Sequence, residues 1–367
     1  MPAEWEEHEC CWLGWPERRD VWPNQAREAK LAVARVCKAI VEEGREDVRL
    51  IVSERCLEEA RAAMVREGLL DRGVEILQLE SNDVWLRDIG PTFVHNEEEK
   101  EASVSGISWR FNGWGLKFPP WDKDDEVAGR IVSSLEGVPL VDCQDFVLEG
   151  GSFHSDGAGT VLTTESCLLH KNRNPGLSRG EIEAKLFEYL GARKVVWLPS
   201  GLVWDEDTDG HVDNFACFGR EGLVLLAWCE CGGKSGACEQ CVACSAALEV
   251  LTTERDAKGR KLEVLKVPLP ETQRYTEEEA QSIEGGTRTA GERLACSYLN
   301  FYIANEAIIL PGFGASADSQ AKEIIERVFP ERKCVQLPAV GRQLSLGGGN
   351  IHCITQQQPK PKMGRST

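Results

Sequence analysis

The stretch Gly349-Asn-Ile-His-Cys-Ile354 leads from small and polar residues into an alternating strand, and the same plan returns elsewhere in the chain. The other copies, usually followed by a second apolar strand, are Gly151-Ser-Phe-His-Ser-Asp156, Gly210-His-Val-Asp-Asn-Phe215 and Ser297-Tyr-Leu-Asn-Phe-Tyr302. Repetition at intervals too long for a solenoid indicates modules repeated around a common centre. In such an arrangement, equivalent strand ends would bring their polar residues to one site.

Amphipathic helical patterns alternate with short apolar runs through the rest of the chain. We expect helices at residues 26–43, 56–69, 122–135, 179–190, 245–253 and 318–329. We expect strands at residues 48–52, 74–79, 92–95, 106–111, 159–164, 195–198, 222–228, 262–267 and 307–310. This mixture predicts an α/β or α+β fold, and periodicity alone does not select one closed architecture.

The overall charge narrows the classes of partner. The chain has 367 residues, with 42 Lys+Arg against 60 Asp+Glu and a formal charge of −18. This charge repels phosphate backbones and anionic lipid, so it disfavours nucleic-acid and membrane-surface roles and favours a cationic or neutral small substrate. With 42% hydrophobic and 28% charged residues the composition is globular, and no apolar run approaches the ~20 residues of a membrane span.

The chain ends and the cysteines indicate location and organisation. The start, Met1-Pro-Ala-Glu-Trp-Glu-Glu-His8, has neither the basic beginning nor the apolar core of a signal peptide, so we expect a cytoplasmic protein. Its fifteen cysteines are then reduced thiols, most of them small buried residues. We expect one domain over residues 1–357 and a flexible basic tail over 358–367. Nothing in the sequence decides whether the chain forms a homo-oligomer.

The strongest local signal is Leu346-Gly-Gly-Gly-Asn-Ile-His-Cys353. Three successive glycines allow a close backbone approach, and a cysteine placed shortly after them can present its sulfur to a cavity. A nearby positive charge or N–H dipoles would have to lower the thiol pKa before it could act as a nucleophile. The alternative is a buried, inert cysteine on a core strand.

The second signal is the acidic stretch that runs from Asp205 into Gly210-His211-Val-Asp213. On an extended strand, His211 and Asp213 would project side by side from the same face. The histidine could exchange a proton while the carboxylate holds a cation. The alternative is a solvated acidic loop with an incidental histidine.

Two further carboxylates stand beside glycines at predicted strand ends, namely Asp88 and Glu149. Asp88 could instead join a structural ion pair, and Glu149 could cap the turn made by Gly150 and Gly151. Together with Cys353, the set suits attack on a planar cationic carbon, because carboxylates grip a guanidinium bidentately while the thiol adds to it.

At these residues the sequence resembles the agmatine deiminase family, within the guanidine-modifying enzymes that include arginine deiminases and peptidyl-arginine deiminases. The resemblance covers nearly the whole chain. Its motifs are Met1-Pro-Ala-Glu-Trp5, Trp12-Leu-Gly-Trp-Pro16, Asn82-Asp-Val-Trp-Leu-Arg-Asp88, Trp121-Asp-Lys-Asp-Asp125, Glu149-Gly-Gly-Ser152, Asp209-Gly-His-Val-Asp-Asn214, Asn300-Phe-Tyr-Ile-Ala-Asn305 and Gly348-Gly-Asn-Ile-His-Cys-Ile-Thr-Gln-Gln357.

The resemblance implies a fold and a chemistry. The fold is a five-bladed α/β propeller, or pentein, of repeated ββαβ-type modules around a central active site. The reaction is hydrolysis of agmatine to N-carbamoylputrescine and ammonia through a covalent amidino-thioether, as in putrescine and polyamine biosynthesis, with no metal or organic cofactor. Every site residue takes a role from the resemblance, as follows. Cys353 is implied to be the nucleophile and His211 the general acid and base. Asp88 and Asp213 would bind the guanidinium, and Glu149 would contact both the substrate and His211. Trp85 and Asp207 would line the path of the aliphatic chain and its terminal amine.

The chain departs from the family pattern in two places. The segment 113–121 is shorter than its counterpart, so one loop near the pocket is trimmed. Where relatives have an acidic stretch, residues 229–244 form a loop with Cys229-x-Cys231 and Cys238-x-x-Cys241-x-x-Cys244. These spacings could bind zinc, but the sequence favours a reduced, variable surface loop.

Two alternatives to agmatine hydrolysis stay open. A deiminase of free arginine would need a cationic group for the α-carboxylate, whereas the acidic stretch 205–209 suits a terminal ammonium; peptidyl arginine is a related substrate. The other alternative is a catalytically impaired homologue in which the cysteine-rich loop binds zinc.

Overall fold

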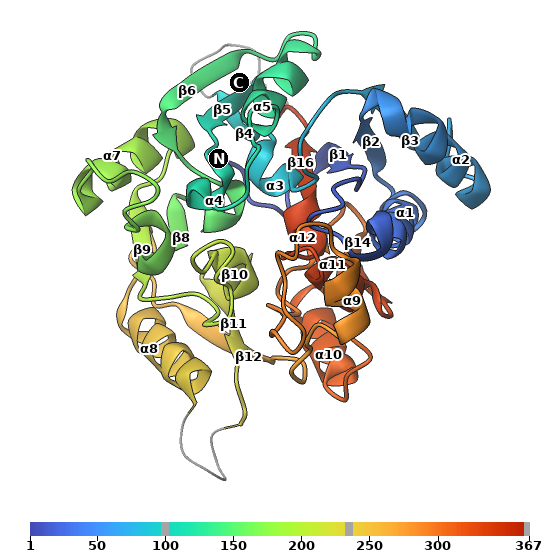
Figure 1. Cartoon of the computed structure of the whole chain (residues 1–367). Coiled ribbons are helices and arrows are strands. Elements are labelled where there is room, and N and C mark those ends of the chain that lie inside the picture. Colours follow the sequence, from blue (N-terminus) through green and yellow to red (C-terminus); the bar gives the residue numbers. More distant parts are fainter. Residues whose placement is uncertain (97–102, 232–237, 363–367) are drawn as a thin grey trace.

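A computed structural model of the chain describes residues 1–96, 103–231 and 238–362. Within these ranges the strands form five mixed sheets, four with three strands and one with four (Figure 1). In each sheet the first two strands pair antiparallel and the next pair parallel. The chain therefore has an α/β fold built from one repeated plan.

The sheets follow one another in the order of the chain, with one exception. The first sheet takes its antiparallel strand, β16, from the C-terminal part of the chain. The sheets are β16-β1-β2-β3, β4-β5-β6, β7-β8-β9, β10-β11-β12 and β13-β14-β15. The strands are β1 His8–Gly14, β2 Asp47–Val52, β3 Val74–Gln78, β4 Thr92–Asn96, β5 Ser103–Arg110, β6 Leu140–Val147, β7 Phe153–Ser155, β8 Thr160–Thr164, β9 Lys194–Leu198, β10 Ala216–Arg220, β11 Leu223–Trp228, β12 Glu263–Pro268, β13 Tyr302–Ile303, β14 Ala307–Pro311, β15 Lys333–Leu337 and β16 Thr355–Pro359.

Helices make the crossovers that parallel strands require. The longer helices are α1 Arg27–Glu42, α2 Leu57–Glu67, α5 Asp124–Ser133, α7 Arg179–Leu190, α8 Glu239–Thr253 and α10 Asp318–Val328. The shorter ones are α3 Leu86–Ile89, α4 Gly113–Leu116, α6 Glu165–Leu168, α9 Glu277–Ser282, α11 Val340–Ser345 and α12 Ile351–Ile354, with 3-10 turns η1 Pro23–Ala26, η2 Glu54–Cys56, η3 Gly150–Ser152 and η4 Val212–Asn214. Among the described residues no helix is both long enough and apolar enough to cross a membrane.

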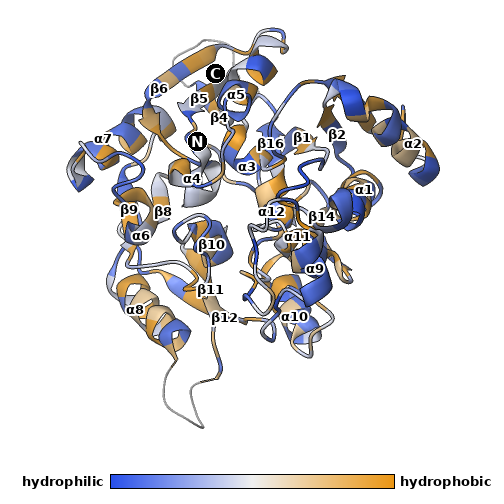
Figure 2. Ribbon diagram, in the orientation of Figure 1, coloured by the Kyte–Doolittle hydropathy of each residue, from blue (hydrophilic) through white to orange (hydrophobic). Residues whose placement is uncertain are grey.

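The helices and strands predicted from periodicity are confirmed, with ends that differ by a few residues. Helix α1 buries Val33, Val36, Cys37 and Ile40 against the sheet, as its apolar spacing predicts. Figure 2 shows the same division, because hydrophobic residues concentrate on the strands while the outer helices α2 and α7 carry hydrophilic faces. Neither periodicity nor the repeated plan predicted the strands β1, β6 and β15.

Three expectations about particular segments are wrong. Helix α8 begins at Glu239, so Cys241 and Cys244 lie on a helix and not in a loop. The tail does not begin at residue 358, because Gln358 and Pro359 belong to the buried strand β16. There the Gln358 side chain accepts a hydrogen bond from the indole of Trp12 on β1, at 3.1 Å. Of the expected tail, residues 363–367 lie outside the described residues.

The third wrong expectation is that His211 and Asp213 project from the same face of a strand. His211 directly precedes the 3-10 turn η4, and Asp213 lies inside that turn. A helical turn of this length is too short to leave a periodic signal in the sequence.

Short segments that precede the first strand of each sheet meet near the centre of the molecule. The repeated plan is confirmed before β7, β10, β13 and β16, and a related turn, α3, precedes β4. Turn α3 contacts both α12 and η3, and η3 contacts η4. Figure 1 shows α12 and α3 lying inside the succession of sheets. Each sheet thus delivers one short segment to a common place.

Candidate active site

These central segments carry the side chains that the sequence analysis selected. Asp88 lies in α3 and Cys353 in α12. Glu149 and His211 directly precede η3 and η4, without a side-chain capping hydrogen bond, and Asp213 lies inside η4. Residues that are up to 265 positions apart in the sequence are therefore neighbours in space.

Gly151 shows how closely three of these side chains approach. A Cβ atom added to this glycine would lie 2.6 Å from Nδ1 of His211, 2.9 Å from Oδ2 of Asp213 and 3.0 Å from Oδ1 of Asp88. Only hydrogen fits at this position, so the backbone of η3 forms a wall of the site.

Cys353 is held by contacts from two other segments. Its Sγ donates to Oδ2 of Asp213 at 3.4 Å and accepts from Nδ2 of Asn300 at 3.1 Å. Its backbone N–H donates to Oδ1 of the same Asn300 at 3.2 Å. Asn300 precedes β13, so the remaining sheet also supplies a residue to the site, one that the sequence analysis did not single out.

The three glycines before Cys353 each have a packing reason. A Cβ on Gly349 would lie 2.5 Å from the Trp85 ring and 2.9 Å from Cβ of Cys353. Gly348 has φ of +111°, which L side chains rarely adopt, and Gly347 packs directly against the Trp22 ring. The run of glycines lets α12 approach the aromatic residues beside the thiol.

The surroundings of Cys353 favour the protonated thiol. Burial raises its pKa well above the ordinary value, and the carboxylates of Asp213 and Asp88 raise it further. A cation placed between these carboxylates would act in the opposite direction and favour the thiolate.

His211 is a fully buried, charged ring. Burial by itself lowers the pKa of His211, because it disfavours the charged ring. The neighbouring Asp88, followed by Cys167 and Glu149, together have the larger effect in the opposite direction, so the pKa of His211 rises well above 6.5. Its Nδ1 lies 3.8 Å from Oδ1 of Asp88. Within the described ranges neither ring nitrogen makes a hydrogen bond. The ring therefore has a proton to donate to a ligand.

The carboxylates that flank the thiol are fixed by different partners. Asp88 accepts the Trp114 indole N–H on Oδ2 and the Gly151 N–H on Oδ1, both at 2.9 Å. Asp213 has Nδ1 of His352 at 2.9 Å from Oδ2. Burial opposes its charge, but the hydrogen bond from His352 prevails and lowers the pKa of Asp213. The other oxygen, Oδ1, has no hydrogen-bond partner in the described part of the chain and can receive one from a substrate.

Glu149 is held by a buried arginine. Nε of Arg173 donates to Oε1 of Glu149 at 2.6 Å, and both side chains are fully buried. The same guanidinium donates to Oδ2 of Asp209 at 2.8 Å and to the carbonyl of Thr208 at 3.1 Å. Arg173 thus ties Glu149 to the loop that carries His211, while Oε2 of Glu149 keeps no partner among the residues described.

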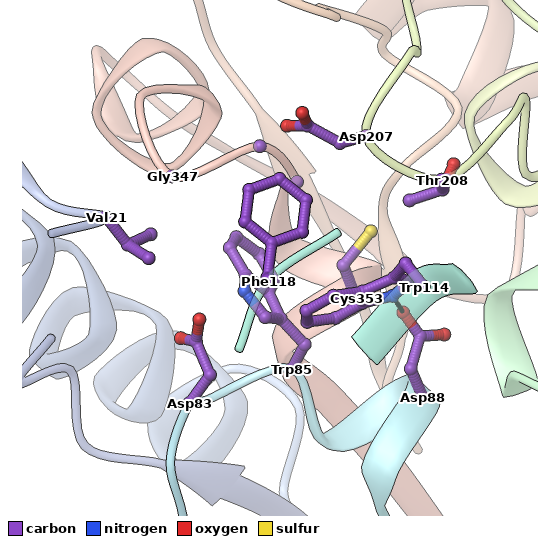
Figure 3. Close-up of a pocket in the computed structure, with 12 residues that line it drawn as sticks. Val21, Asp83, Trp85, Asp88, Trp114, Phe118, Asp207, Thr208, Gly347 and Cys353 are labelled. Carbon is purple, nitrogen blue, oxygen red and sulfur yellow. Dashed lines mark hydrogen bonds between the residues drawn. The ribbon is translucent and has the colours of Figure 1, made fainter. Parts of the chain in front are cut away.

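A pocket opens above the thiol, and its walls are aromatic. Figure 3 shows the rings of Trp85, Trp114 and Phe118 around Cys353, with Asp88, Asp83 and Asp207 on different sides. Trp114 and Phe118 come from the segment 113–121, which was expected to be trimmed and which lines the pocket nevertheless. An apolar channel with carboxylates at its ends suits a long cation with an aliphatic middle.

Asp207 lies at the wall of the pocket as part of an ion pair. Asp207 lines the pocket, but its two oxygens are paired with Arg288, at 2.9 Å from Nη1 and 2.5 Å from Nη2. The carboxylate is therefore neutralised by a cation that lies 81 residues away in the sequence. No local pattern identifies Arg288 or Arg173, because each acts through distant partners.

A site that can hold a planar cation against a thiol is typical of hydrolases that act on the C–N bonds of guanidines. The comparison with known proteins gives the particular family. Over residues 1–359 the chain matches the Porphyromonas-type peptidyl-arginine deiminases, and it belongs to this family.

Relatives and solved structures agree with this assignment over the whole chain. The agmatine deiminase of Pseudomonas aeruginosa strain LESB58 is 47% identical over 371 residues, which cover 99% of this chain and 96% of that protein. The solved agmatine deiminase of Enterococcus faecalis is 39% identical with a TM-score of 0.88, covering 98% of this chain and 96% of that one. A cysteine-to-serine variant of the C. jejuni agmatine deiminase with substrate bound is 26% identical with a TM-score of 0.82, and covers 98% and 96%.

Proposed function

We propose that this chain is an agmatine deiminase, which hydrolyses agmatine to N-carbamoylputrescine and ammonia. The observation that carries the proposal is the full-length similarity to agmatine deiminases, at 47% identity, in a chain whose Cys353 lies beneath an aromatic pocket flanked by carboxylates. The reaction would place the protein in putrescine and polyamine biosynthesis in the cytoplasm. The chemistry needs only groups that the chain itself provides.

In the first half of the reaction the guanidinium lies between Asp88 and Asp213. Its positive charge offsets the two carboxylates, so the Cys353 thiol loses its proton to solvent and becomes a nucleophile. Sγ attacks the guanidinium carbon, and the charged His211 gives its proton to a terminal nitrogen. The C–N bond breaks, ammonia leaves, and an amidino-thioether on Cys353 remains.

In the second half water replaces the thiol. The now neutral His211 takes a proton from water, whose oxygen attacks the amidino carbon. The C–S bond breaks, the sulfur regains a proton, and the carbamoyl product is released. Glu149, with its unpaired Oε2, is positioned for the substrate nitrogens and for His211, whose ring it helps to keep charged.

The arrangement of the sheets is proposed to be a five-bladed propeller, each blade carrying the ββαβ plan. The support is that five sheets of one plan each send a short segment to the same centre. The pairing of β16 with β1 then completes the first blade with a strand from the C-terminal part of the chain. A ring closed in this way explains why residues from every sheet surround one thiol.

One observation favours a second candidate, a deiminase of arginine. Arg288 stands at the pocket wall beside Asp207, and a guanidinium at that place could bind an α-carboxylate. Asp207, in contrast, would attract the terminal ammonium of agmatine. The two candidates differ in the substrate group that binds at the far end of the pocket, which is an ammonium in agmatine and an α-carboxylate in arginine.

Incubation with three substrates separates these candidates. Purified protein is given agmatine, free arginine or a short arginyl peptide, and ammonia and the carbamoyl product are measured over time. We expect turnover of agmatine at least an order of magnitude above that of the other two. Ammonia from arginine but none from agmatine would replace the proposal with the second candidate.

A further inference from the structure

The segment that leaves β11 and enters α8 gathers four thiols. Cys229 and Cys231 follow the end of β11 at Trp228, while Cys238 caps α8 and Cys241 lies in its first turn. Figure 1 places this end of α8 at the edge of the molecule, away from α12 at the centre. The reaction proposed for Cys353 makes no use of these residues.

The sulfur atoms form a compact group. The Sγ of Cys231 lies 3.3 Å from that of Cys229, 3.0 Å from that of Cys238 and 3.6 Å from that of Cys241. The Sγ of Cys238 also lies 3.6 Å from those of Cys229 and Cys241. All four could ligate a single ion.

These separations fit a tetrahedral metal site better than they fit disulfides. A Zn–S bond of about 2.3 Å implies S···S edges of about 3.8 Å in a tetrahedron, whereas a disulfide brings two sulfurs to about 2.05 Å. We propose that Cys229, Cys231, Cys238 and Cys241 bind one zinc ion as a closed, structural tetrathiolate site. Four protein ligands leave no open position, so the metal stabilises the fold and takes no part in hydrolysis.

The ligands are the two pairs Cys229-x-Cys231 and Cys238-x-x-Cys241, and not the neighbouring Cys244. The thiol of Cys244 is buried and donates to the carbonyl of Ala227 at 3.2 Å. The sequence alone could not exclude Cys244, because it continues the same spacing. The position of α8 makes the choice, since it turns Cys244 toward β11.

One end of helix α8 favours the ionised thiols that zinc requires. Cys238 and Cys241 stand at the N-terminal end of a 15-residue helix, where unpaired N–H groups stabilise negative charge. A zinc tetrathiolate carries a net charge of −2, which the N-terminal end of α8 offsets in part.

Zinc at this place would join the end of β11 to the start of the crossover helix α8. Helix α8 contacts β11 and β12 of its own sheet and β9 of the preceding sheet. The site therefore stabilises the junction between two sheets. This proposal does not depend on the substrate of Cys353, and its test does not use activity.

Metal content provides the first test. The full chain, purified from zinc-supplemented cells and dialysed without chelator, should hold about one zinc per chain by plasma mass spectrometry. Cys231→Ser and Cys238→Ser should each lower the zinc content at least tenfold, whereas Cys244→Ser and Cys334→Ser should retain it. Wild-type protein without zinc, or with iron in its place, would overturn the assignment.

A second measurement covers variants that fail to fold. Cobalt added to the metal-depleted wild-type chain should give the visible ligand-field bands and sulfur-to-metal charge transfer of a tetrahedral thiolate site, with one equivalent at saturation. Zinc should displace the cobalt and restore the melting temperature that depletion lowers. Octahedral cobalt spectra, or disulfides Cys229–Cys241 and Cys231–Cys238 in peptide mapping of the freshly purified protein, would contradict the proposal.

Discussion

The thiol of Cys353 donates its hydrogen to Oδ2 of Asp213, at an Sγ···O distance of 3.4 Å. The same oxygen lies 2.9 Å from Nδ1 of His352, whose other nitrogen lies 2.9 Å from Oε1 of the buried Glu4. The carboxylate proposed to receive the guanidinium is thus also the one that holds the thiol proton. Loss of the thiol proton and binding of the guanidinium are therefore linked. The cation stabilises the thiolate, and the thiolate in turn strengthens the binding of the cation.

The first prediction concerns the reactivity of the free thiol. Because burial and two carboxylates raise the pKa of Cys353, alkylation by iodoacetamide should be slow at neutral pH and should keep rising beyond about pH 8.5. Mass spectrometry of the peptide that carries Cys353 measures this rate without interference from the other cysteines. A rate that levels off between about pH 6 and about pH 8 would show a thiolate in the substrate-free enzyme.

Replacement of the nucleophile is the second prediction. Cys353→Ser should lower agmatine turnover by roughly 10³-fold or more, because a serine hydroxyl is far less acidic than a thiol and the charge of the guanidinium does not suffice to ionise it. The fold should persist, since an oxygen can still contact Asn300 and Asp213. Circular dichroism and the melting temperature check the fold, and ammonia release checks activity. Retained turnover would mean that the nucleophile is misassigned.

The third prediction uses the close approach at Gly151. Gly151→Ala adds one methyl group 2.6 Å from Nδ1 of His211 and 2.9 Å from Oδ2 of Asp213, so both side chains must shift. We expect kcat to fall by about 10²-fold, since a displacement of about 1 Å in a catalytic group has this effect.

A matched glycine controls for the substitution itself. Gly176 is exposed and has nothing within 4 Å of an added Cβ, so Gly176→Ala should leave kcat unchanged. Equal kcat values for the two alanine variants would show that the space at Gly151 does not matter for catalysis.

Sequence patterns predicted the longer elements because burial imposes a period on them. Helix α1 buries every third or fourth residue, and the apolar strands are short and continuous. The repeated plan around Gly349 and its copies also located the place where the sheets meet. It could not give the conformation there, because turns such as η4 and α12 contain only three or four residues.

From the residues alone, the candidate site was most visible where a reactive group and glycines occur together, and the family resemblance supplied the roles. Cys353, His211 and Glu149 follow or precede glycines, which marks them in the sequence. Arg173, Arg288 and Asn300 act through contacts with residues 24, 81 and 53 positions away, respectively, so no local window contains both partners. Such pairs become visible only once the sheets place them side by side.

The fourth prediction concerns stability and pH. Asp83 and Asp124 are buried close together, and burial raises the pKa of Asp83 to about 6 and that of Asp124 to about 7. Both values exceed the ordinary 3.8, so the folded state binds protons that the unfolded chain releases. The stabilisation is complete below the ordinary pKa and is lost as pH rises to about 7, at about 1.4 kcal/mol for each unit of pKa difference.

Asp124→Asn should weaken this dependence, because the amide stays neutral at every pH. Its oxygen can still accept the backbone N–H groups of Asn82 and Asp83, at 2.6 Å and 3.0 Å in the present structure. Urea unfolding at about pH 5 and about pH 8 gives the change in unfolding free energy for each protein. We expect the decrease toward high pH to be smaller in the variant than in the wild type. Equal decreases would place the titrating groups elsewhere.

The last prediction tests what Arg288 does at the pocket wall. Its guanidinium neutralises Asp207, so in an agmatine deiminase it competes with the terminal ammonium of the substrate. Arg288→Gln should therefore lower the KM for agmatine by about 2- to 5-fold and leave kcat nearly unchanged, in line with about 0.5–1 kcal/mol for a partly exposed ion pair.

Asp207→Asn should have the opposite effect, raising the KM for agmatine, because the ammonium then loses its anionic partner. Arg220→Gln, which breaks an exposed pair with Glu263, is the matched control and should change neither constant. The same variants separate the two substrate candidates, since an arginine deiminase would use Arg288 to hold the α-carboxylate. A rise in KM for arginine in Arg288→Gln, with agmatine unaffected, would assign the pocket to arginine.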